Sequence, residues 1–184
     1  APAVLTMALG ATLYRFTITL QHVDRGIYET LDLRAAAHPS ETTASVITRV
    51  LAHCFFQEEG MAFSRGGLSD PDEPALSVHT LDGRMTLWVD IGVPSAERLH
   101  KASKACARVA VVTHKRPGLL LESVASGTIH RREHLELYAL DEELLAQLDA
   151  VVKNLHYRLE ALLWKMVIVT VVWTVHSGAL QPLT

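Results

Sequence analysis

Two acidic residues, Asp72 and Asp90, lie eighteen positions apart, and each stands beside a run of residues typical of a β-strand. Asp72 follows a proline in a turn, and Asp90 lies near the end of the apolar run 85–91. The turn dipeptide Asp82-Gly83 joins the two runs into a hairpin, so both carboxylates would lie at one end of a sheet. Converging carboxylates bind Mg²⁺ or Mn²⁺, and such an ion can activate water to cleave a phosphodiester.

A cationic side chain beside the attacking water would complete such a site. Metal-dependent nucleases commonly carry a lysine two residues after the second acid, but Gly92 holds that position here. The next lysines, Lys101 and Lys104, lie on a predicted helix whose apolar face comprises Leu99, Ala102, Cys106 and Val109. At about 100° per residue, Lys104 points away from this face and Lys101 lies at its flank, about 120° from the centre. The long stem of Lys101 could reach back to the strand end, so Lys101 is the better candidate.

Glu41 could add a further acid to this site. It follows Ser40, the predicted N-cap of a helix with apolar residues at helical spacing over 47–55. An acid in the first turn of a helix also stabilises the helix dipole without taking part in any site. The two strand acids could equally be solvated surface carboxylates, and the helix lysine a solvated cation. The spacing alone leaves both interpretations open.

Further polar residues are candidates for a role in binding. Lys115 and Arg116, together with Arg131 and Arg132, could contact phosphate groups, although charged pairs in loops are more often simply solvated. His38 precedes a proline and is therefore expected to be extended. We expect it to brace the loop beside the predicted helix by a hydrogen bond rather than to bind a metal.

Composition limits the class of protein. The 184 residues predict one domain, and a net charge of −3 gives no general positive field for nucleic acid, so contact with DNA or RNA would be local. Cys54 and Cys106 fall on apolar helix faces, as expected of a reduced, cytoplasmic chain. The N-terminal segment lacks the basic region of a signal peptide. Met7 resembles a natural start, so we expect a single domain over 7–184, with residues 1–6 as an addition.

The order of predicted elements indicates the fold class. We expect an opening hairpin over 11–35, a long helix, a loop over 60–74, a second hairpin, two further helices with strands after each, and a helix over 141–155 before apolar C-terminal strands. This order predicts an α/β or α+β fold with a mixed β-sheet flanked by helices. The apolar segment 159–175 carries Lys165 and many β-branched residues, which favours buried strands over a membrane span. Phosphate-loop, dinucleotide, serine-hydrolase and paired-cysteine motifs are absent from the sequence.

Several motifs, in this order, resemble the YaeQ family of bacterial proteins. They are MALGATLYRF from Met7, DRGIY from Asp24, HPSET from His38, FSRGGLSDPDEP from Phe63, LWVDIGVP from Leu87 and RLHKAS from Arg98. The resemblance covers roughly 7–114 and is weaker after that. It implies a variation of the PD-(D/E)XK nuclease fold, with an αβ core and an N-terminal hairpin.

The resemblance also implies roles for particular residues. Asp72 and Asp90 match the two nuclease acids, Lys101 matches the lysine moved onto the helix, and Glu41 matches the helix acid. On this basis we predict a Mg²⁺ or Mn²⁺ site made by both aspartates and the backbone carbonyl of Ile91, in a monomeric phosphodiester hydrolase acting on nucleic acid. The alternative is a non-catalytic nuclease-fold protein that binds a protein or nucleic-acid partner, because a fold does not establish an activity.

Overall fold

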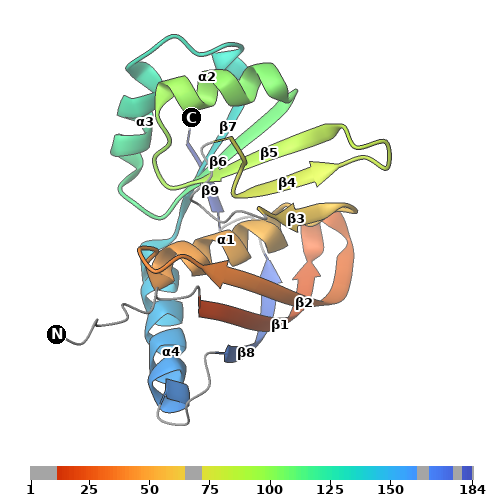
Figure 1. The fold of residues 1–184 in the computed structure, drawn as a ribbon, viewed down its shortest axis with the longest axis vertical. Coiled ribbons are helices and arrows are strands. Elements are labelled where there is room, and N and C mark those ends of the chain that lie inside the picture. The colour runs from red at the N-terminus through yellow and green to blue at the C-terminus, as the bar shows by residue number, and fades with distance from the viewer. Residues whose placement is uncertain (1–11, 65–71, 161–165, 176–179, 184) are drawn as a thin grey trace, which may run out of the picture.

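The computed structural model describes residues 12–64, 72–160, 166–175 and 180–183, and Figure 1 shows their arrangement. Residues 1–6, which we expect to be an addition, lie outside this part of the chain. The described residues form two β-sheets and four α-helices. The mixed α and β architecture with helices flanking strands is therefore confirmed.

The smaller sheet contains the predicted opening hairpin. Strands β1 (Thr12–His22) and β2 (Ile27–Ala37) pair antiparallel around a short 3₁₀ turn, and β8 (Met166–Val175) joins parallel to β1. The apolar segment near the C-terminus thus contributes a strand, as its β-branched residues predicted. No helix in the described ranges is long and apolar enough to cross a membrane.

The larger sheet has the order β3-β4-β5-β6-β7-β9. Its strands are β3 (Met61–Phe63), β4 (Leu76–His79), β5 (Met85–Ile91), β6 (Arg108–Thr113), β7 (Leu135–Leu140) and β9 (Leu180–Pro182). Strands β5, β6 and β7 are parallel, while the outer pairs are antiparallel, so the sheet is mixed. The expectation of a plain loop over 60–74 was wrong at its start, because β3 pairs there with β4.

Four helices pack on these sheets: α1 (Thr43–Phe55), α2 (Ala96–Ala105), α3 (Pro117–Ala125) and α4 (Glu142–Glu160). Helix α1 lies between the two sheets, α2 and α3 cover the outer face of the larger sheet, and α4 runs beside the smaller one (Figure 1). The N-cap of α1 is Thr42, whose side chain accepts a hydrogen bond from the Ser45 N–H, and not Ser40 as predicted. Glu41 therefore precedes the helix and does not lie in its first turn.

The hydrophobic core has two parts, one on each face of the larger sheet. Leu87 and Val89 of β5 pack with α1 and the smaller sheet, whereas Trp88 packs with Leu99 of α2 and with α3. Side chains alternate between the two faces of a strand, so Asp90 shares the face of Trp88. This alternation decides which elements each polar side chain of β5 can reach.

Candidate functional site

Asp90 forms a buried ion pair with Arg98. Its carboxylate accepts two hydrogen bonds, both 2.8 Å long, from Nε and Nη2 of Arg98. The Asp90 side chain is only 3 % exposed. The same Nη2 also donates to the backbone carbonyl of Glu73 at 2.7 Å, and the guanidinium lies 5.6 Å from the centre of the Trp88 ring. A fork of two parallel hydrogen bonds is the strongest way in which the chain can hold a carboxylate.

The local sequence explains why arginine reaches this position. Ser95 caps α2 and accepts a hydrogen bond from the Arg98 N–H, which fixes the first turn of the helix over the end of β5. Arg98 is not among the site residues predicted from the sequence. It stands three positions before Lys101, on a neighbouring part of the helix surface, and a guanidinium matches the geometry of a carboxylate better than an ammonium does.

The structure brings Lys101 and Asp72 into contact. The Lys101 Nζ forms an ion pair with Oδ1 of Asp72, and both side chains are more than half exposed. Asp72 also borders a cavity of about 590 Å³ beside β3 and β4. Because Arg98 is bonded to the residue after Asp72, the ion pairs of Asp90 and Asp72 are neighbours along the N-terminal half of α2.

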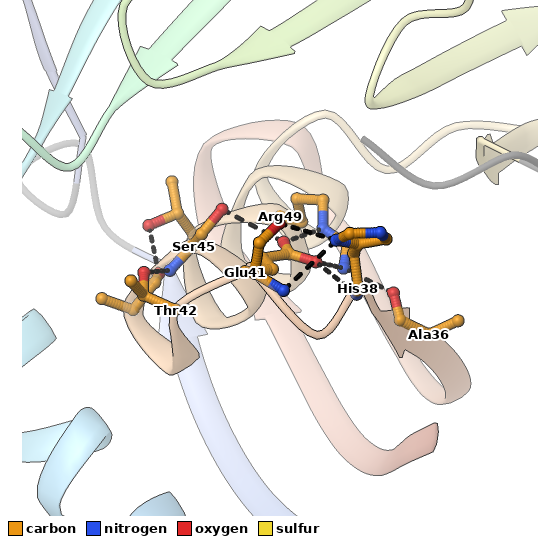
Figure 2. Close-up of polar contacts among 9 residues, drawn as sticks. Ala36, His38, Glu41, Thr42, Ser45 and Arg49 are labelled. Atoms are coloured by element: carbon orange, nitrogen blue, oxygen red, sulfur yellow. Dashed lines mark hydrogen bonds and ion pairs between the residues drawn. The ribbon is translucent and has the colours of Figure 1, made fainter. Parts of the chain in front are cut away.

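Glu41 lies apart from these residues and belongs to a separate buried network (Figure 2). Nε and Nη2 of Arg49 each donate to one of its oxygens at 2.9 Å, and both side chains are 2 % exposed. Ser45 Oγ donates to the same carboxylate at 3.1 Å, and Arg49 also donates to the Ala36 carbonyl at 2.8 Å. The network ties the end of β2 and the loop before α1 to the helix itself.

The three acids do not converge, because the larger sheet separates Glu41 from the other two, and Asp72 and Asp90 contact different cations of α2. Asp90 points to α2, whereas Ile91 packs on the α1 side and borders the same cavity as Glu41. Within the described residues, no three histidine, cysteine, aspartate or glutamate side chains form a group that could hold a metal ion. Each predicted acid instead contacts a cation of the chain itself, so this arrangement of donors does not fit Mg²⁺ or Mn²⁺, which require several oxygen ligands. The predicted metal role of the Ile91 carbonyl remains a prediction.

A cavity of about 660 Å³ opens where β5 and β6 end and α1 begins. We call it the strand-end cavity. One side is formed by His38, residues 40–42 and Ser45, and the other by residues 91–93 with His114 and Lys115. His38 braces the loop, as predicted, because its Nδ1 lies 2.6 Å from Ser40 Oγ. Burial, and after it the neighbouring Lys115, lower the pKa of His114 below its ordinary value, which favours the neutral imidazole.

Comparison with known proteins identifies relatives of the chain. The family described as YaeQ protein matches residues 7–164. The YaeQ protein of Escherichia coli K12 is 32 % identical over 145 residues, which cover 78 % of this chain and 80 % of that protein. The YaeQ protein of Salmonella typhi is 31 % identical over 144 residues, covering 78 % and 79 %.

Solved structures agree with this match. The crystal structure of YaeQ from Pseudomonas syringae has a TM-score of 0.75 at 28 % identity, covering 96 % of this chain and 98 % of that one. The crystal structure of YaeQ from Xanthomonas axonopodis pv. citri has a TM-score of 0.74 at 27 % identity, covering 94 % and 90 %. By sequence and by fold, the chain belongs to the YaeQ family.

Proposed function

We propose that this YaeQ-family chain acts by binding a partner and does not hydrolyse it. In this proposal the acids at the nuclease-like positions are parts of ion pairs that hold the fold. The observation that carries the proposal is the engagement of both Asp90 oxygens by Arg98 in a buried position. This is the non-catalytic alternative that the sequence analysis left open.

Physical chemistry supports this assignment. A metal ion at Asp90 would have to replace two hydrogen bonds to a guanidinium and also release the bond from Arg98 to the Glu73 carbonyl. Hydrogen bonds to charged groups contribute about 1.5–3 kcal/mol each, and the partly exposed Arg98 would lose its contact with the Asp90 carboxylate. The ion pair therefore competes with any cation for the same oxygens.

Titration calorimetry with Mn²⁺ tests the proposal without any guess about a substrate. We expect no saturable binding that depends on Asp72 or Asp90. The unmodified chain is compared with Asp72→Ala and Asp90→Asn, each checked for folding by circular dichroism. Saturable Mn²⁺ binding that disappears in both variants would contradict the proposal.

The class of partner can be identified by filter binding of DNA and RNA at increasing salt. Contacts to phosphates weaken steeply as salt rises, so the retention of a nucleic-acid partner falls with salt. Salt-sensitive retention would identify nucleic acid as the partner. Absence of retention at low salt would instead point to a protein partner, which is the other half of the proposal.

A second candidate function is the Mg²⁺- or Mn²⁺-dependent hydrolysis of phosphodiesters in nucleic acid. The contact of Lys101 with Asp72 favours it, because this contact sets a cation beside an acid on an exposed surface next to Asp90. If this candidate is correct, Lys101→Ala abolishes metal-dependent cleavage of DNA or RNA. Cleavage that is unchanged in Lys101→Ala would remove this lysine from the mechanism.

A further inference from the structure

The α2 residues that form ion pairs, Arg98 and Lys101, do not line the strand-end cavity. The cavity has the position and size of a ligand site. Ligands of open α/β sheets bind outside the carboxyl ends of parallel strands, and the cavity lies where the parallel strands β5 and β6 end. Its volume of about 660 Å³ falls in the range of small-molecule sites, about 300–1,000 Å³.

The charges around the cavity favour an anion. Glu41 is the one carboxylate among the described lining residues, and the buried Arg49 neutralises it. Lys115 is exposed at the rim, and within the described part of the chain its ammonium forms no ion pair. The lining therefore carries one uncompensated positive charge.

Two side chains on the side of the cavity before α1 can donate hydrogen bonds, and they belong to His38 and Thr42. His38 engages Ser40 through Nδ1, which leaves its Nε2 for another partner. Thr42 uses its hydroxyl oxygen as an acceptor for the Ser45 N–H, so its hydroxyl hydrogen can still be donated.

Part of the lining is apolar. Ile91 and Val93 border the cavity on each side of Gly92, whose missing side chain leaves His114 Cε1 at 3.7 Å from the place of a Cβ atom. A ligand with one anionic end and one less polar end matches this lining. Specific polar groups on a partly apolar wall are typical of small-molecule sites.

We propose that the strand-end cavity binds a phosphate monoester, with the phosphate at Lys115, His38 and Ser40 and the organic part against Ile91 and Val93. Such a phosphate is carried by a free mononucleotide or by the 5′ end of a nucleic acid. This inference goes beyond the proposed function, because it does not depend on the state of Asp90, Asp72 or Lys101.

The test measures binding of adenosine 5′-monophosphate, adenosine and inorganic phosphate to the full chain by titration calorimetry. We expect binding of the monophosphate, weaker binding of inorganic phosphate and none of adenosine. Lys115→Gln should weaken binding of the monophosphate about tenfold, because it removes a charge-assisted hydrogen bond. Ser40→Asp should abolish binding by adding a negative charge at an exposed position of the lining.

Lys104→Gln is the matched control, because Lys104 is an exposed lysine at the end of α2 and does not border the cavity. The inference is overturned if the monophosphate does not bind, if adenosine binds equally well, or if Lys115→Gln and Lys104→Gln have the same effect. Oligonucleotides with and without a 5′-phosphate distinguish the sources. Preference for the 5′-phosphorylated strand over the monophosphate assigns the site to nucleic-acid ends, and the reverse preference assigns it to free nucleotides.

Loss of monophosphate binding in Lys115→Gln says nothing about Asp90, and Mn²⁺ binding at Asp90 says nothing about the cavity. Failure of this inference and failure of the proposed function are therefore separate results.

Discussion

At the residue scale, burial separates the three ion pairs of the predicted site residues. The pair of Glu41 with Arg49 is buried on both sides, Asp90 is buried against a partly exposed Arg98, and the pair of Asp72 with Lys101 is exposed. Breaking a buried pair leaves an uncompensated charge in a medium of low polarity. An exposed pair loses little, because water replaces the partner.

This difference predicts the stability of two variants. Arg49→Met should lower the free energy of unfolding by about 3–5 kcal/mol, because the buried Glu41 carboxylate then lacks a positive partner. Asp72→Ala should lower it by less than about 1 kcal/mol. Urea unfolding at pH 7 measures both. Equal losses in the two variants would show that burial does not govern these contacts.

His53 gives a prediction about pH. Burial lowers its pKa to about 4, and its ring packs 5.0 Å from that of Phe63. The folded protein keeps His53 neutral, whereas the unfolded chain binds a proton below its ordinary pKa of 6.5. This contribution to stability is therefore complete above pH 6.5 and is lost as the pH falls toward 4. Between pH 7.5 and pH 5 the loss is about 2 kcal/mol.

Urea unfolding at these two pH values tests the effect with His53→Leu, which removes the titrating group. We expect the difference in unfolding free energy between pH 7.5 and pH 5 to shrink in this variant. The matched control is His130→Asn, since His130 is exposed. The explanation fails if the two variants show the same pH dependence as the unmodified chain.

At the element scale, the backbone conformation just after β5 explains why a lysine does not stand two residues after Asp90. Gly92 has a φ of +88°, a conformation that side-chain-bearing residues rarely adopt. A lysine two residues after Asp90 would be strained there. The cation that contacts Asp90 near the end of β5 comes from α2 instead, and it is Arg98.

Gly92→Ala should therefore lower the free energy of unfolding by about 1–2 kcal/mol through backbone strain. Space is not the cause, because an added Cβ would meet only His114, at an ordinary contact distance of 3.7 Å. Gly118→Ala is the control, because Gly118 lies in α3 without a positive φ and with open space around it. This control should leave stability unchanged or raise it by up to about 1 kcal/mol. Urea unfolding compares the two, and equal effects would exclude backbone strain as the reason for glycine at 92.

Local patterns predicted most elements well. The strand over 135–140 and the hairpin around Asp82-Gly83 follow directly from apolar runs and turn residues. Strand β3 was missed because it has three residues beside a stretch rich in Gly, Ser and Asp, too few to show a period. The N-cap was placed two residues early, since Ser40 and Thr42 are both good caps and only the backbone decides between them.

The site was harder to predict than the elements. Lys101 could be placed from the helical period, and it does reach Asp72. The partner of Asp90 could not be placed, because it depends on which helix covers which face of the larger sheet. That is a property of tertiary packing, which a single sequence does not encode in any local period.

At the scale of the whole molecule, part of the surface charge of the described residues is paired. Arg15 with Asp32, Arg84 with Asp82 and Arg108 with Glu136 form ion pairs, and the net charge is −3. Paired cations attract phosphates less than free ones do. A partner that is a nucleic acid would thus be held at few points rather than along a continuous basic groove.

The dependence of nucleic-acid affinity on salt measures how many phosphates the protein contacts. Single strands lose affinity with a log–log slope of about −0.7 for each phosphate neutralised. If a 5′-phosphate is held mainly at Lys115, the slope should be about −0.7 and should approach zero in Lys115→Gln, while Lys104→Gln should keep it. A slope steeper than about −4 that persists in Lys115→Gln would instead require an extended phosphate-binding surface. The exposed Arg131 and Arg132 would then be the first residues to replace, because they are the basic pair that the sequence offers for such a surface.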